Sequence, residues 1–122
     1  MKNLTKANED YLETILLLEI EHGEFIKSID IAKHLNVSKP AVNKATNELK
    51  ELGLINKGYY GEISLTEIGR IQAKKVYNKH KAIIDFLKKI GVSSETAEID
   101  CCKIEHILSE ETLQKIEEFN KK

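Results

Sequence analysis

Apolar residues recur at helical spacing along most of the chain, and capping residues and glycines interrupt them. Thr5 is a typical N-cap ahead of an apolar stripe within residues 11–18, and Gly23 is a typical stop. Ser28 precedes a short apolar segment that ends at Asn36, a residue type that tolerates the left-handed conformation. The pattern predicts a first helix between Thr5 and Gly23 and a short second helix capped by Ser28.

A third helix and a hairpin are predicted next. Ser38 is a capping residue, Pro40 is tolerated in a first helical turn, and Gly53 closes the segment. The residues expected on the inward stripe of this helix are Val42, Ala45, Leu49 and Leu52. Two short apolar runs, 54–55 and 63–65, flank a stretch with two glycines and two tyrosines, which indicates a β-hairpin.

The C-terminal half is predicted to be helical. Thr66 begins a long apolar-periodic helix that Gly91 ends, and residues 94–108 and 110–119 predict two more helices, the last capped by Ser109. The expected fold class is mainly α with a small β-hairpin wing. Two helices joined by a tight turn and followed by a hairpin form the winged helix-turn-helix arrangement.

Length and charge narrow the functional classes. The chain has 122 residues, enough for one domain or two small lobes that share a long helix, which excludes a large multidomain enzyme. No apolar run approaches the length of a membrane span, and the N-terminus lacks a secretory signal, so a cytoplasmic protein is expected. Residues 27–90 carry 13 basic and 6 acidic side chains, whereas the rest of the chain carries 6 and 14. This basic middle predicts a surface for a polyanion.

The exposed face of the helix after Ser38 suits DNA. Amides read adenine edges, and lysines contact guanine or phosphate. The candidates for contact with double-stranded DNA are Ser38, Lys39, Pro40, Ala41, Asn43, Lys44, Asn47 and Lys50, with Lys57, Tyr59 and Tyr60 at the hairpin tip. Two alternatives stay open at this point: the face is merely solvated, or the winged helix is a protein-interaction module.

A second group of residues suggests a metal site. On the predicted helix, Cys102, Glu105 and His106 occupy positions i, i+3 and i+4, which places a thiol, a carboxylate and an imidazole on one face. Asp10 and Glu13 are similarly spaced on the first helix, and His80 lies in the long helix. Together they offer oxygen, nitrogen and sulfur ligands for a divalent transition metal.

Each of these residues also has an ordinary structural interpretation. The spacing lacks the CxxC and HxxxH patterns of structural zinc sites. Asp10 and Glu13 are equally compatible with solvent-facing charges, and Cys102 with a small core residue. Cys101 points about 100° away from Cys102 on a helix, so we expect it to pack in the core.

Several stretches carry a resemblance to a known family. They are Glu9–Glu13, Asp30–Ala32, Val37–Val42, Gly61–Gly69 and the Glu105-His106 pair after Cys102. Through them the chain, from about Leu4 to about Phe119, resembles the metal-dependent transcriptional repressors typified by the diphtheria toxin repressor and the manganese transport regulator. The resemblance implies a winged helix-turn-helix DNA-binding domain over residues 1–66 and a helical metal-binding and dimerisation domain over residues 67–122. Some members add an SH3-like domain, for which this chain ends too early.

The resemblance also implies a ligand set of mixed type. The metal-binding positions of the family correspond to Asp10, Glu13, His80, Cys102, Glu105 and His106 in this chain. Iron-type members have methionine at the position of Asp10, and manganese-type members have glutamate at that of Cys102. Iron-type members also have a second, ancillary metal site, which this chain matches only in part. Ile84 occupies the position of a glutamate in those members, and Glu98 occupies the position of a histidine. One or two ions per subunit are therefore expected.

The expected function is metal-activated repression. A thiolate ligand disfavours Mn²⁺, so Fe²⁺ is the favoured cofactor and Mn²⁺ the next. The metal is expected to bridge the two lobes and to let a homodimer bind palindromic operator DNA of metal-homeostasis genes, with no enzymatic activity, membrane partner or small-molecule substrate. The expected dimer surface draws on Ile83, Phe86, Leu87, Ile90, Ile99, Ile104, Ile107, Leu108 and Ile116. The alternatives are a metal-independent winged-helix regulator and a small metalloenzyme.

Overall fold

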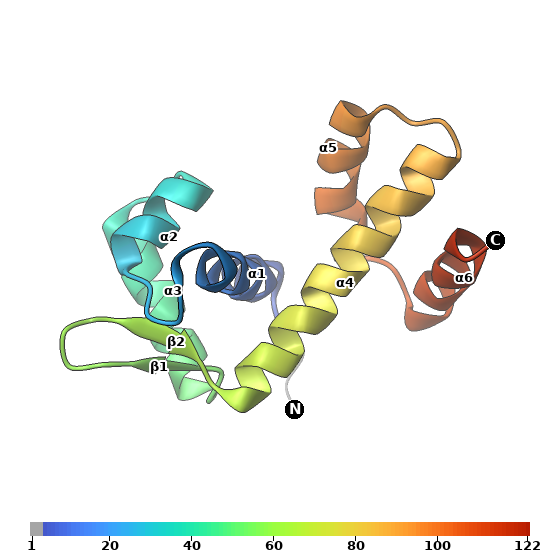
Figure 1. Cartoon of the computed structure of the whole chain (residues 1–122). Coiled ribbons are helices and arrows are strands. Elements are labelled where there is room, and N and C mark those ends of the chain that lie inside the picture. The colour runs from blue at the N-terminus through green and yellow to red at the C-terminus, as the bar shows by residue number, and fades with distance from the viewer. Residues whose placement is uncertain (1–3) are drawn as a thin grey trace. The chain divides into compact units, whose positions relative to one another are not determined.

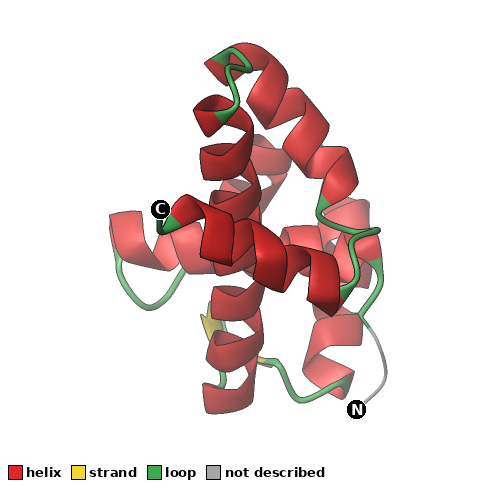
Figure 2. Cartoon of the chain, turned by 90° about the vertical axis from the view of Figure 1, so that its right-hand side faces the viewer, coloured by secondary structure: helices red, strands yellow, loops and turns green. Residues whose placement is uncertain are grey.

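The structure is a computed structural model that describes residues 4–122, and Figure 2 shows its mainly helical content. The chain divides into two compact units, one up to Val76 and one from Tyr77. The division falls within the long helix α4 (Glu67–Lys89), to which both units contribute. Among the described residues, no helix has the length and apolar character needed to cross a bilayer.

The first unit is a winged helix (Figure 1). Its elements are α1 (Lys6–His22), α2 (Ser28–Leu35), α3 (Lys39–Glu51), β1 (Ile55–Lys57) and β2 (Ile63–Leu65). The two strands are antiparallel, with Ile55 opposite Leu65, and a β-bridge between Ile26 and Ile63 extends the hairpin on its other side. Fully buried side chains from all three helices and the hairpin form the core: Leu12, Ile15, Ile31, Val42, Leu49 and Ile63.

Local capping explains most of the helix boundaries. Thr5 accepts a hydrogen bond from the Asn8 amide at 3.0 Å, and Ser38 accepts one from Ala41 at 3.2 Å, which confirms both predicted caps. Asn36 adopts the predicted left-handed conformation, with φ 55° and ψ 52°. The cap predicted for α2 is wrong: the N-cap is Lys27, because its amide donates to the Asp30 carboxylate at 3.2 Å and starts the helix one residue earlier.

Two further predictions for α3 and the hairpin are corrected. Leu52 was expected on the inward stripe of α3, but it lies beyond the last helical residue and is 39% exposed. Thr46 is buried on the inward face, and its hydroxyl donates a hydrogen bond to the Val42 carbonyl at 2.8 Å. Strand β1 begins at Ile55 and not at Leu54, because the Leu54 amide and carbonyl bond to Leu49 and Thr66.

Helix α4 is fastened to the first unit at its N-terminus. Thr66 accepts from the Gly69 amide at 2.9 Å and donates to the Gly53 carbonyl at 2.7 Å, which confirms its predicted capping role. Gly69 packs so closely that an added Cβ would lie 1.8 Å from the Leu54 carbonyl oxygen. A buried carboxylate, Glu19, adds an ion pair with Arg70 at 2.8 Å and accepts from the Leu65 amide at 3.2 Å. These contacts tie α1, β2 and the start of α4 together.

The second unit packs α5 (Ser94–Ile104) and α6 (Glu110–Asn120) on either side of the C-terminal half of α4 (Figure 1). Its buried core contains Ile83, Ile84, Leu87, Ala97 and Cys101. Ser93 and Ser109 cap the two helices by accepting from the amides of Thr96 and Thr112. The Lys89 ammonium donates to the carbonyls of Phe119, Asn120 and Lys122, where it complements the negative end of the α6 dipole.

The predicted helix over residues 94–108 is too long. Helix α5 ends at Ile104, Glu105 is its C-cap, and the Ile107 amide turns back to the Ile104 carbonyl at 3.0 Å. The chain leaves the helix through this turn and then reaches Ser109, which is extended and caps α6. His106 therefore lies in a turn and does not continue the helix.

The residues expected at a dimer surface differ in their burial. Ile83 and Leu87 are buried in the core of the second unit. Three of the set remain exposed, namely Ile90, Ile99 and Ile107. The other four, Phe86, Ile104, Leu108 and Ile116, are half-buried.

Candidate metal centre and nucleic-acid surface

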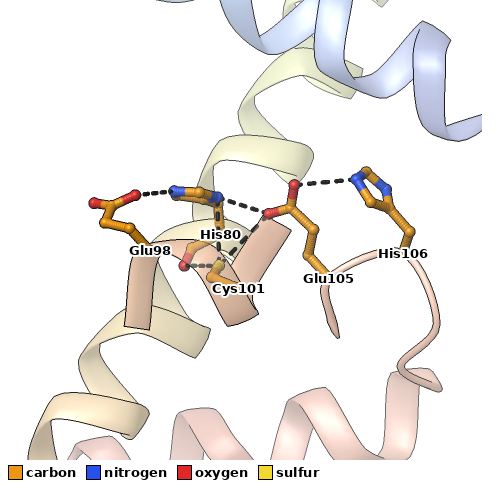
Figure 3. A network of polar contacts seen from close by, with 5 residues as sticks. All are labelled: His80, Glu98, Cys101, Glu105 and His106. Carbon is orange, nitrogen blue, oxygen red and sulfur yellow. Dashed lines mark hydrogen bonds and ion pairs between the residues drawn. The ribbon is translucent and has the colours of Figure 1, made fainter. Parts of the chain in front are cut away.

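The Glu105 carboxylate is the centre of a polar network in the second unit (Figure 3). Its side chain is 2% exposed, and its two oxygens face two different imidazoles. Oε2 lies 2.7 Å from Nδ1 of His80 on α4, and Oε1 lies 3.2 Å from Nε2 of His106 in the turn after α5. The α5 C-terminus thus holds a buried carboxylate between two potential nitrogen ligands.

The sulfur in this network is that of Cys101. Its Sγ lies 3.4 Å from His80 Nδ1 and 3.7 Å from Glu105 Oε2, and the thiol donates to the His80 carbonyl at 3.3 Å. Ligand atoms of His80, Cys101 and Glu105 all lie within 4.8 Å of one another. One nitrogen, one sulfur and one oxygen therefore converge between α4 and α5 (Figure 3).

Burial controls the protonation of the thiol. It raises the pKa of Cys101 above its usual value, and the neighbouring His80 offsets part of that rise. The Glu105 carboxylate acts in the same direction as burial, because it disfavours a second negative charge. Without a cation to stabilise the thiolate, Cys101 is therefore a protonated hydrogen-bond donor at neutral pH.

Glu98 lies on the opposite side of the His80 ring. Its Oε2 is 3.7 Å from His80 Nε2, within ion-pair range, and its side chain is 62% exposed. The two ring nitrogens of His80 thus face two different carboxylates, Glu98 and Glu105. An outer carboxylate of this kind orients an imidazole whose other nitrogen faces a ligand site.

Four of the candidate ligands named from the sequence lie in this network, together with Cys101, which was expected to pack in the core. His80, Glu98, Glu105 and His106 were candidate ligands and lie together, whereas Cys102 is exposed and its neighbour Cys101 faces His80. The signal for Cys101 is the spacing of Ala97, Cys101 and Glu105, which places one residue per turn on the same face, and all three are buried. Asp10 and Glu13 lie half-buried on α1 in the first unit.

The donors fit a divalent transition metal. Imidazole, carboxylate and thiolate together suit Fe²⁺, Co²⁺ or Zn²⁺, and carboxylates with imidazoles alone also suit Mn²⁺. A buried carboxylate between two imidazoles is the arrangement expected at such a site, because a cation offsets the cost of burying the charge. His80, Glu105 and His106 are therefore buried or half-buried candidates to hold such an ion.

The candidate DNA-contacting residues form a surface on α3. Lys39, Pro40, Asn43, Lys44, Asn47 and Lys50 are exposed, as is the capping residue Ser38, and Ala41 is half-buried. The ammonium of Lys57 on β1 donates to the Asn47 side chain at 3.1 Å, so the wing is connected to the exposed face of α3. This face presents lysines and amides side by side, as a helix that reads base edges does.

Two tyrosines project from the tip of the wing. Tyr59 and Tyr60 are 93% and 88% exposed and stack edge to face, with ring centroids 5.1 Å apart. The turn beneath them is closed by hydrogen bonds from the Gly61 amide to Gly58 and from the Gly58 amide to Glu62. Exposed aromatic side chains held on a fixed turn are suited to contact a partner.

Comparison with known families matches both halves of the chain. Residues 3–62 match the profile described as iron dependent repressor, N-terminal DNA binding domain. Residues 66–122 match the profile described as iron dependent repressor, metal binding and dimerisation domain.

Relatives cover most of the chain. A protein of Methanocaldococcus jannaschii described as an uncharacterized HTH-type transcriptional regulator is 40% identical over 120 residues, which is 98% of this chain and 96% of that protein. The transcriptional regulator MntR of Escherichia coli is 37% identical over 114 residues, covering 93% of this chain and 73% of that protein.

Solved structures share the fold. IdeR of T. acidophilum superposes with a TM-score of 0.78 at 31% identity, over 97% of this chain and 55% of that one. The manganese regulator SloR superposes with a TM-score of 0.81 at 28% identity, over 95% of this chain and 54% of that one. The chain spans about half the length of both.

Proposed function

The chain belongs to the family of iron-dependent repressors, and from this premise we propose that it is a metal-activated repressor whose homodimer binds palindromic operator DNA in the cytoplasm. Fe²⁺ is the favoured ion and Mn²⁺ the next, because the thiol of Cys102 is among the proposed ligands. The regulated genes are proposed to be those of metal homeostasis.

The buried Glu105 carboxylate is the observation that carries this proposal. Apolar side chains of similar volume would stabilise a small core at least as well as a buried ionic network does. The second unit nevertheless buries Glu105 beside His80 and His106. This buried network lowers the folding stability relative to an apolar core, and it consists of residue types that bind metals. Both features support a role in binding a metal ion.

Coupling between metal and DNA follows from where the proposed ligands lie along the chain. Asp10 and Glu13 belong to the unit that carries α3, and Cys102, Glu105 and His106 belong to the other. We propose that they serve one bound ion, which restricts the separation of the two recognition helices in the dimer. A winged-helix dimer reads half-sites about one helical turn apart, so only one separation fits the operator.

Fluorescence anisotropy of a labelled fragment from the gene's own upstream region tests the proposal. The full chain is titrated in chelator and then with Fe²⁺ or Mn²⁺, under anaerobic conditions at matched salt. We expect tighter binding with metal, and a larger effect of Fe²⁺. Equal binding in chelator would contradict the proposal and favour a metal-independent regulator. Absence of binding in both conditions would favour the metalloenzyme alternative.

A further inference from the structure

We propose that Glu19 and Arg70 are positioning residues, which fix the direction of α4 against α1 and so couple metal binding to the wing. Glu19 lies on α1 and Arg70 in the first turn of α4. Neither is among the residues proposed to bind metal or DNA. The inference rests on the proposed function, because it names a contact through which metal binding and DNA binding are coupled.

Glu19 is a buried carboxylate whose two oxygens contact two different elements. The residue is 9% exposed, Oε1 pairs with Arg70 at 2.8 Å, and Oε2 accepts a hydrogen bond from the Leu65 amide at 3.2 Å. Burial of a carboxylate costs stability, and an apolar side chain of similar volume would pack at least as well. What the pair adds is a specific arrangement of α1, β2 and α4.

The Leu65 amide connects this pair to the wing. Leu65 lies opposite Ile55 in the antiparallel hairpin, and the next residue, Thr66, donates its hydroxyl to the Gly53 carbonyl at 2.7 Å. The start of α4 is therefore attached to α1 through Arg70 and to both ends of the hairpin. A change in the direction of α4 against α1 would displace the backbone at the base of the wing.

The same two helices also lead to the proposed metal ligands. On α1, Asp10 and Glu13 precede Glu19, and α4 continues past Arg70 into the second unit. An α-helix rises about 1.5 Å per residue, so Asp10 lies about 14 Å from Glu19 along α1. The proposed ligands thus join α1 to the second unit at one point, and Glu19 joins α1 to α4 at another. One connection lets a helix pivot, whereas two separated connections fix its direction.

A double variant, Glu19→Gln with Arg70→Met, removes the polar link to α4 and buries no unpaired charge. Its glutamine still accepts a hydrogen bond from the Leu65 amide. Ile31→Val is the control for a loss of stability, because Ile31 is fully buried on α2, an element that the pair does not join. Anisotropy measures the operator affinity of each protein in chelator and with Fe²⁺, anaerobically. The Fe²⁺ affinity is measured without DNA, and circular dichroism checks the fold.

We expect Fe²⁺ to tighten operator binding by the same factor in the unsubstituted chain and in Ile31→Val. In the double variant this factor should fall at least about threefold. Its operator affinity in chelator and its Fe²⁺ affinity without DNA should not change. Arg70→Lys, which keeps the charge, should retain the factor.

An unchanged factor in the double variant would overturn the inference. Equal losses in Ile31→Val or in Arg70→Lys would overturn it as well, because stability or side-chain shape would then explain the effect. A loss of Fe²⁺ affinity without DNA would also overturn it, because the pair would then act on the metal site itself. The unsubstituted chain tests the proposed function separately: if Fe²⁺ leaves its operator affinity unchanged, the proposed function fails, and the inference fails with it.

Discussion

In the first unit the residues proposed to contact DNA lie on the surface of α3 and the wing, whereas in the second unit three of the residues proposed to hold metal, His80, Glu105 and His106, are largely buried. Asn43 and Tyr59 are exposed, and the fold does not depend on them. Glu105 and Cys101 are buried, and Cys101 is part of the apolar core itself. DNA recognition and stability are therefore separable in the first unit, whereas ligand binding and stability are linked in the second.

This difference follows from the chemistry of the two partners. DNA is a large polyanion that must be met by an outer surface in contact with its grooves. A metal ion is small and binds best where a few donors converge in a dry, fixed environment. The following substitutions test whether the two units differ in this way.

The largest effect is expected from Glu105→Gln. The substitution removes the charge that faces both His80 and His106, so Co²⁺ affinity should fall by at least about 100-fold, about 2.7 kcal/mol. Competition against a chromogenic chelator measures it, with circular dichroism as a check of folding. Glu98→Gln is the matched control, with an expected loss of about tenfold, at the low end for an outer carboxylate because this one is exposed. Equal losses in both variants would contradict the central position of Glu105.

Gly69→Ala should destabilise the first unit by about 2 kcal/mol. Helix propensity alone predicts the opposite sign, a gain of about 1 kcal/mol. The close approach of the Leu54 carbonyl decides the sign, because an added Cβ would lie 1.8 Å from its oxygen. Urea unfolding measures the change, and the exposed α4 position Lys74, changed to alanine, is the control. A more stable Gly69→Ala protein would show that this contact is absent.

Asn43→Ala should weaken operator binding about tenfold, as expected for loss of one base contact. Its Co²⁺ affinity without DNA should not change, because Asn43 is exposed on α3 in the other unit. The matched control is Asn78→Ala on α4. Anisotropy gives the DNA affinity and metal titration gives the Co²⁺ affinity, both on the same preparations. A Co²⁺ affinity that fell together with the DNA affinity would contradict the claim that the two kinds of binding depend on different residues.

Two helix caps allow the same substitution in each unit. Ser38→Ala and Ser93→Ala each remove a hydroxyl that accepts a hydrogen bond from a helix N-terminus, at a cost of about 1 kcal/mol. Only Ser38→Ala should also weaken DNA binding, since Ser38 lies at the entrance of α3. Thermal unfolding and anisotropy separate the two effects. A loss of DNA affinity in Ser93→Ala alone would be inconsistent with this assignment.

Tyr59→Ala should have the smallest effect on stability, within about 0.5 kcal/mol, because the side chain is almost fully exposed. Its effect on DNA binding should be a modest weakening, seen by anisotropy at matched salt. Unchanged DNA affinity would remove the wing tip from the interface.

Capping and periodicity predicted most of the fold because they depend on local interactions. Thr5, Ser38 and Thr66 were identified as caps from residue type alone, and the structure confirms them. The errors occur where a neighbouring residue shifts the boundary. Asp30 moves the start of α2 to Lys27, and α5 ends at Ile104, where the chain turns before Ser109 caps α6.

The metal centre was less predictable because it depends on tertiary packing. The sequence predicts that Cys101 packs in the core, which the structure confirms, but it does not predict that His80 lies beside it. The packing of α5 through Ala97 and Cys101 decides this and brings Cys101 to His80. The pairing of His80 with Glu105 likewise joins residues 25 positions apart.

The central claim is that metal and operator binding favour the same state of the protein. Thermodynamic linkage requires that operator DNA tighten metal binding by the same factor by which metal tightens DNA binding. The direct test is the Fe²⁺ affinity of the full chain, measured anaerobically with and without saturating operator. We predict a higher affinity with operator, by the factor obtained from anisotropy. Identical affinities in the two conditions would contradict the claim.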